Sequence, residues 1–234
     1  MIFDPIYILF ALPGLLLGFG AQMLVKRRFA HFSQVPNQTG LSGAEVAARI
    51  LRDASIHNVT IEPVQGMLSD HYDPTAKALR LSHDVFYGRS IAAAGVAAHE
   101  VGHAIQDASG YRWLRMRSAL VPVLKFTSPL ALPTLLVGTV LMSMGMIFGK
   151  PVAVLGVVLF GALVLFQLVT LPVEFDASRR ALESVERAGL IAGETGGARK
   201  VLNAAALTYV AAAVASIGQL LYWLHRLGLL GGRR

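Results

Sequence analysis

Three uncharged apolar runs constrain the fold of this chain more than any other feature of its sequence. They cover residues 6–25, 126–148 and 152–172. Each run has the ~20 residues that an α-helix needs to cross the hydrocarbon core of a bilayer. Apolar residues make up 54% of the chain and charged residues only 15%, a composition typical of membrane proteins. The runs therefore predict a mostly helical protein with at least three transmembrane helices.

A fourth uncharged run, residues 201–224, precedes a basic end that contains Arg233 and Arg234. If this run crosses the membrane, the terminal arginines lie outside, against the tendency of cationic residues to remain on the cytoplasmic side. The sequence therefore leaves two possibilities open, a fourth transmembrane helix and a buried or interfacial helix. We expect three or four spans in total.

The charges around the first run predict its orientation. Asp4 precedes the run, and the cations Lys26, Arg27 and Arg28 follow it. A cleaved signal peptide carries its positive charge before the apolar segment, so we expect a retained anchor whose cationic end is cytoplasmic. The net charge is +7, but the cations lie beside apolar spans and form no face interleaved with aromatic residues. We therefore expect no nucleic-acid partner.

Residues 29–117 are more polar than the rest and predict a small α+β domain. Ser42 and Glu45 have the spacing of a capping box, which marks the start of a helix. Short segments with the composition of strands follow, separated by residues typical of turns. The predicted elements are a helix over 41–55, strands over 59–61 and 78–81, and a turn at 70–74. We expect the strands to form a hairpin or meander beside the helix described next.

One short motif in this domain carries chemistry. His99, Glu100 and His103 form the pattern H-E-x-x-H in an Ala-rich segment, residues 90–106, that predicts a helix. Histidines four residues apart share one helix face, so both rings can hold one Zn²⁺ from the same side. Glu100 could then take a proton from water activated by the metal. Histidines on an ordinary solvated helix are the alternative, which the surrounding Ala, Val and Gly residues disfavour.

A catalytic zinc usually keeps three protein ligands, so a third ligand must lie outside this motif. The chain has no cysteine. The continuation H-E-x-x-H-x-x-G-x-x-H is also absent, because Gln106 and Ser109 occupy its last two defined positions. Asp107, four residues past the second histidine, lies on roughly the same helix face. It could reach the metal, act as an outer partner of a ligand or simply end the helix.

The polar segment 173–200, which we expect to be cytoplasmic, offers better candidates. Glu174 comes directly after the third apolar run, and two spans between it and the motif return the chain to the same side of the membrane. An acid at a membrane boundary requires a partner, either zinc or a nearby arginine. Asp176 is the next candidate ligand. On a helix it lies ~200° around the axis from Glu174, so the two cannot face one metal.

These motifs resemble those of the YugP-type bacterial membrane-bound neutral zinc metallopeptidases, in the segments Ala97–Gln106 and Glu174-Phe-Asp-Ala-Ser178. The resemblance covers nearly the whole chain. More remotely, the chain is similar to the HtpX proteases and the CAAX prenyl-protein metalloproteases of membranes, whose Glu-x-x-x-Asp motif supplies the third zinc ligand. Glu174 matches that glutamate, whereas Ser178 replaces the aspartate, a departure that concerns the partner of a ligand. The resemblance implies a gluzincin-like (zincin-like) domain with zinc on His99, His103 and Glu174 and with Glu100 as the base.

Motif and resemblance together predict a zinc-dependent endopeptidase of the bacterial inner (cell) membrane, with its active site facing the cytoplasm. Expected partners are membrane lipid and protein or peptide substrates, and a homo-oligomer or a partner membrane protein stays open. A zinc hydrolase of another substrate and a zinc-binding scaffold without turnover are the alternatives. Glu100 disfavours the scaffold, because a structural zinc site needs no base. The candidates for stabilising an oxyanion or supporting a ligand are His71, Tyr72, His83, Asp107, Asp176, Ser178 and Tyr209.

Overall fold

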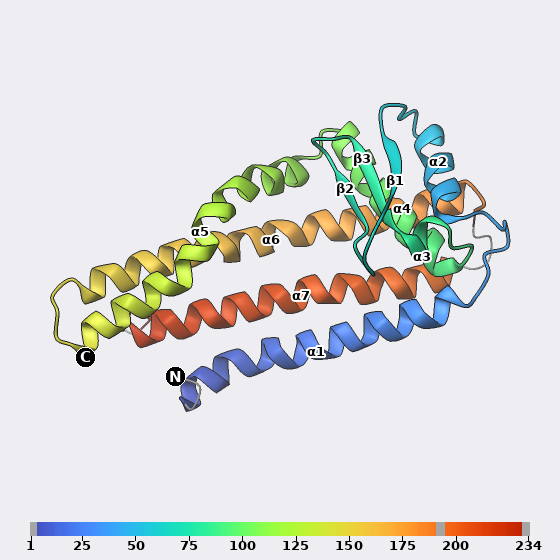
Figure 1. Ribbon diagram of the computed structural model, residues 1–234. Helices are drawn as coiled ribbons and strands as arrows, with labels where there is room; N and C mark the ends of the chain where they lie inside the picture. The colour runs from blue at the N-terminus through green and yellow to red at the C-terminus, as the bar shows by residue number, and fades with distance from the viewer. Residues whose placement is uncertain (1–3, 191–194, 231–234) are drawn as a thin grey trace. The chain divides into compact units, whose positions relative to one another are not determined.

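The computed structural model describes residues 4–190 and 195–230, which form long helices and one small sheet (Figure 1). The elements are α1 (Pro5–Ser33), α2 (Gly43–Asp53), β1 (Thr60–Val64), β2 (His71–Asp73), β3 (Ala78–Ser82), α3 (His83–Phe86), α4 (Ile91–Ala108), α5 (Arg112–Ser143), α6 (Gly149–Arg187) and α7 (Thr195–Arg226). The chain is thus mostly helical, as its composition predicts.

Four of the described helices, α1, α5, α6 and α7, are long and apolar enough to cross a membrane. The apolar runs 6–25, 152–172 and 201–224 each lie within one of them. The run 126–148 extends past the end of α5, because Gly145 adopts a φ of +73° and ends the helix. By length and composition, therefore, α7 is suited to be the fourth span that the sequence left open.

Helix α6 continues well past the third apolar run, through the first part of the predicted segment 173–200. Pro172 lies inside the helix without ending it. Beyond it, Arg179 pairs with Asp176 and Glu183, and Arg180 also pairs with Asp176, at the i+3 and i+4 spacings that stabilise helices. Residues 191–194 of the predicted segment lie outside the described residues.

The sheet contains a hairpin, as expected, but also a parallel pair of strands. Its order is β1-β3-β2, with β2 antiparallel and β1 parallel to β3. The meander alternative is therefore wrong. The predicted turn at 70–74 is also wrong in part, because His71–Asp73 forms strand β2. Asp73 makes the expected turn contacts, since its carboxylate accepts from the backbone N–H groups of Thr75 and Ala76, a few residues further on.

The chain divides into two compact units, one of which holds the sheet and contains Ala21–Arg115 and Pro172–Leu207. In this unit the sheet and α2 pack around α4 (Figure 1). Helix α2 begins with the predicted capping box, in which Ser42 and Glu45 bond each other's backbone N–H. The core joins side chains of α2, β3 and α4, among them the buried Ile50, Leu79 and Val101. Helix α4 is thus a central, rigidly packed element of its unit.

Candidate metal centre

Helix α4 presents the two histidines of the motif on one face. Ser90 starts the helix by accepting a hydrogen bond from the backbone N–H of Ala93, and 18 residues follow without proline. The rings of His99 and His103 have centroids 4.9 Å apart. Most of α4 is buried, including Glu100 between the two histidines. The local sequence therefore builds a rigid helix that holds both imidazoles inside the protein.

Glu174 of α6 meets these two rings. Its Oε2 lies 3.2 Å from His99 Nε2 and 3.6 Å from His103 Nε2. One ligand atom from each of the three side chains lies within 4.8 Å of the others. Ligands held at ~2.0–2.2 Å in a tetrahedron are separated by about 3.3–3.6 Å, so one zinc ion fits among them. Two imidazoles and one carboxylate are also a common donor set of hydrolytic zinc.

The second nitrogen of each ring also has a partner. His99 Nδ1 lies 3.1 Å from the Ser178 hydroxyl, and His103 Nδ1 lies 3.0 Å from Gln106 Oε1. Ser178 follows Glu174 by one helical turn, so both side chains reach the same side of α6. Ser178 thus supports the ring of His99 from the helix that carries Glu174. Each imidazole can be held by Nδ1 while Nε2 faces the site.

Glu100 lies in the same region, and its carboxylate is nearly buried. The backbone N–H of Tyr72 in strand β2 donates a hydrogen bond to it. Burial, together with the nearby carboxylates of Glu174 and Asp70, raises the pKa of Glu100 to about 7, although His99 opposes the shift. A dication at the site lowers this pKa again. Glu100 is therefore a carboxylate of raised basicity beside the three candidate ligands.

Two of the predicted site residues have contacts elsewhere. Asp107 accepts from the hydroxyl of Tyr72 at 2.6 Å and from Lys77 Nζ at 2.5 Å, and so ties α4 to the hairpin. His83 begins α3 and packs its ring against Tyr87, with centroids 4.7 Å apart. Neither contact belongs to the ligand cluster. Asp107 instead anchors Tyr72, the residue whose backbone holds Glu100.

The remaining candidates lie in different settings. Asp176 contacts Gln106 and two arginines, as described below, and does not join the group of three ligands. His71 turns its Nδ1 toward the Ser69 carbonyl at 2.8 Å. Tyr209 belongs to the other unit. We assign an oxyanion donor to none of these side chains.

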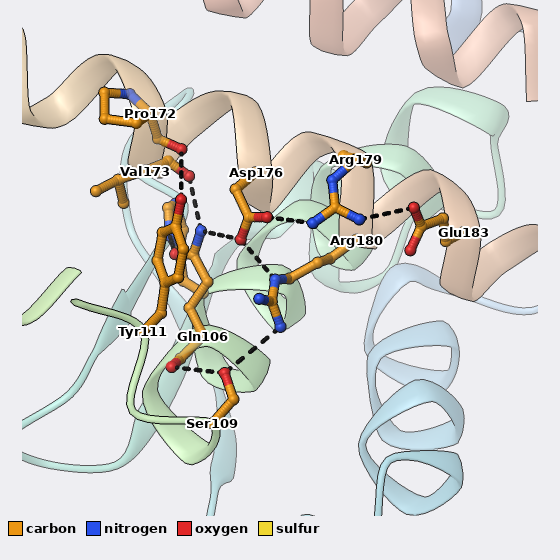
Figure 2. A network of polar contacts seen from close by, with 10 residues as sticks. Gln106, Ser109, Tyr111, Pro172, Val173, Asp176, Arg179, Arg180 and Glu183 are labelled. Atoms are coloured by element: carbon orange, nitrogen blue, oxygen red, sulfur yellow. Dashed lines mark hydrogen bonds and ion pairs between the residues drawn. The ribbon is translucent and has the colours of Figure 1, made fainter. Parts of the chain in front are cut away.

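Sequence reasoning missed Gln106, which it treated only as a residue in place of the glycine of a longer motif. Gln106 is fully buried. Its amide contacts the Val173 carbonyl and Asp176 (Figure 2). It also contacts His103 Nδ1. The available signal was its position, three residues past the second histidine on an apolar helix. Its partners on α6 could not be found without the fold.

Helices α4 and α6 approach closely at Gly102. A Cβ at this position would collide with the backbone carbonyl of Ala177 and lie within 3.2 Å of its Cα. Only glycine therefore allows the distance at which Glu174 reaches the two rings. The requirement is steric, because Gly102 lies in regular helix.

We expect Gly102→Ala to lower both stability and zinc affinity, because the added methyl group must push α4 away from α6. Overpacking of this kind costs about 1–3 kcal/mol. The midpoint of thermal unfolding in detergent should fall by several degrees, and zinc should bind about tenfold more weakly in a chelator competition. Gly161→Ala is the control, because a Cβ there meets nothing within 4 Å. Unchanged zinc affinity in Gly102→Ala would contradict the role of this contact.

Comparisons with known proteins indicate a family of zinc-dependent peptidases. A family model described as "Putative neutral zinc metallopeptidase" matches residues 7–228, which include both histidines, Glu100 and Glu174. The chain is similar to the "Putative membrane protease YugP" of Bacillus subtilis (strain 168), with 47% identity over 217 residues. The aligned part covers 92% of this chain and 94% of that protein. No solved structure matches the chain.

Proposed function

Because this chain belongs to the neutral zinc metallopeptidase family, as its motifs predicted, we propose that it is a membrane-embedded zinc endopeptidase. It hydrolyses peptide bonds of membrane proteins or peptides at the cytoplasmic face of the bacterial inner membrane. The observation that carries the proposal is the convergence of His99, His103 and Glu174, with Glu100 beside them. A structural zinc site has no use for the fourth residue, whereas a hydrolytic one needs a base there.

His99, His103 and Glu174 are the residues that would hold zinc. When bound, the metal polarises the scissile carbonyl and increases the acidity of water. Glu100 takes a proton from the attacking water and delivers it to the amine that leaves. The oxygen of that water forms the new bond to the acyl carbon, and the C–N bond breaks. The second proton of the water stays on this oxygen, so the products are a carboxylic acid, which then ionises, and an amine. The Tyr72 N–H keeps the Glu100 carboxylate oriented between these two transfers.

The ligand contacts support a particular topology. Between His103 and Glu174 the chain contains α5 and the apolar part of α6, both suited to cross a membrane. Two crossings return Glu174 to the side of α4, and its 3.2 Å contact with His99 requires that they share a side. The cations that follow the apolar part of α1 favour the cytoplasm as that side. The site therefore lies where cytoplasmic parts of membrane proteins can enter.

Metal removal tests the enzymatic proposal. The full chain, purified in detergent, should cleave an unfolded casein-type substrate, lose this activity on treatment with a zinc chelator, and regain it when Zn²⁺ is added. The activity should return because the three ligands remain in place without covalent change. Cleavage that persists in the chelator would contradict a zinc-dependent mechanism. Zinc binding without any cleavage by the parent chain would favour a scaffold or a hydrolase of another substrate.

A further inference from the structure

We propose that Gln106 is a positioning residue that selects the metal-binding form of His103 and fixes helix α4 against the part of α6 that carries Glu174. The proposal rests on the metal site of the proposed function, but not on the nature of the substrate. It follows from the three contacts of a single buried amide.

The orientation of the Gln106 amide is determined by its two contacts with α6. Its Nε2 donates to the Val173 carbonyl at 2.8 Å and to Asp176 Oδ2 at 2.9 Å (Figure 2). Both partners are acceptors, so the NH₂ group must face them. The remaining atom, Oε1, then faces His103 Nδ1 at 3.0 Å and can only accept a hydrogen bond.

This geometry decides which nitrogen of His103 carries the proton. Because Oε1 only accepts, Nδ1 must be protonated, and the lone pair of the neutral ring is therefore on Nε2. Nε2 is the atom that lies 3.6 Å from Glu174 Oε2, on the side of the candidate metal. With the amide reversed, its NH₂ group would face Nδ1 and favour the form with a proton on Nε2, which cannot bind a metal through Nε2.

Asp176 is itself held in place, so the amide cannot easily reverse. Arg180 Nε lies 2.5 Å from Asp176 Oδ2, and Arg179 pairs with Oδ1 (Figure 2). Arg180 also packs over the ring of Tyr111, 5.5 Å from its centroid. The carboxylate is thus fixed from two sides, and its Oδ2 accepts from both Arg180 and Gln106. A reversed amide would place its oxygen against this carboxylate and against the Val173 carbonyl.

The same contacts join the two ligand-bearing helices. Val173 and Asp176 lie one residue before and two residues after Glu174. Gln106 therefore contacts α6 on both sides of the third ligand. The hydroxyl of Tyr111 adds a contact to the Pro172 carbonyl at 3.4 Å. At His99 the support is weaker, because the Ser178 hydroxyl can rotate and either donate or accept. We therefore expect Gln106 to contribute more to the ligand geometry than Ser178 does.

Two substitutions separate this role from simple packing. Gln106→Met keeps the length of the side chain but removes the acceptor for His103 and both donors to α6. Gln106→Glu keeps the acceptor but places a carboxylate against Asp176 and the Val173 carbonyl. We expect each to weaken zinc binding by about 10- to 100-fold. Glu183→Gln, at the far and more exposed end of the Arg179 contact, should stay within about twofold of the parent chain.

The measurements use the full chain in detergent. Chelator competition gives the affinity for Zn²⁺, the visible absorption of the Co²⁺-loaded protein reports the ligand geometry, and thermal unfolding shows that each variant is folded. We expect weaker binding and an altered Co²⁺ spectrum in both Gln106 variants. A folded Gln106→Met with parental affinity and spectrum would overturn the proposal. If Gln106→Met does not fold, a zinc affinity of Gln106→Glu equal to that of the parent chain would overturn the proposal. Failure of the parent to cleave peptides would refute the proposed function and leave these results unaffected.

Discussion

Glu100→Gln should abolish most peptide hydrolysis and leave zinc binding intact. Glutamine has the shape of glutamate and can still accept the hydrogen bond from the Tyr72 N–H, but its amide cannot take a proton from water. General-base catalysis contributes about 10²–10⁴-fold to a rate, so we expect kcat/KM for a casein-type peptide to fall by at least about 100-fold. The zinc content of the purified variant should equal that of the parent chain.

The two measurements distinguish the possible roles of Glu100. If the variant hydrolysed peptides at the parental rate, Glu100 could not be the base. If it lost its zinc, Glu100 would have to be a ligand, which disagrees with the position of Glu174 between the two rings. Glu62→Gln is the matched control, because Glu62 is an exposed acid on β1 that pairs only loosely with Arg80, at 3.4 Å. It should retain both zinc and activity.

The helices could be predicted because their signals are local. The uncharged runs define the spans by length alone, and the capping box at Ser42 and the Ala-rich segment 90–106 mark α2 and α4. The residues at which the helices end were less predictable. Helix α6 passes through Pro172 into a charged segment, because pairs such as Asp176 with Arg180 stabilise one more stretch of helix. Such pairs depend on the helix that they stabilise, so composition does not reveal them.

The sheet shows the limit of local patterns more clearly. The segments 59–61 and 78–81 have the composition of strands, but neither contains a signal that the two strands pair in parallel. Strand β2 is only three residues long, follows Asp70 and ends at Asp73 before Pro74, so its sequence favours a turn. It becomes a strand because β3 offers it hydrogen bonds and Tyr72 is anchored by Asp107. These are tertiary contacts.

The sequence predicts the candidate site only where its residues lie within one helical turn. His99, Glu100 and His103 follow from spacing. Glu174 required an argument about membrane topology together with a resemblance, since 70 residues and two apolar helices separate it from the motif. The only local signal for Gln106 was its position three residues past His103, and a glutamine on a helix has no distinctive pattern. Its role appears only when α6 brings Val173 and Asp176 to its amide.

Glu174→Ala should remove most of the zinc. Asp176→Ala is the matched comparison that tests which acid is the third ligand. Both acids lie on α6 near Gln106, and both are largely buried, with side chains 3% and 11% exposed. Only Glu174 reaches the two rings. Loss of one of three ligands should weaken zinc binding by more than about 100-fold, the upper range for residues that merely support a ligand. Atomic absorption of the purified variants measures the metal, with chelator competition for the affinity.

Asp176→Ala should weaken zinc binding by no more than about tenfold, because Gln106 retains its bond to the Val173 carbonyl and with it the orientation of its amide. Full zinc in Glu174→Ala together with its loss in Asp176→Ala would reassign the third ligand to Asp176. That assignment would also require α6 to turn about its axis, since residues two apart point ~200° away from each other. Such a rotation would break the contact of Ser178 with His99 as well. The affinities of the two variants therefore test the ligand and the orientation of the helix together.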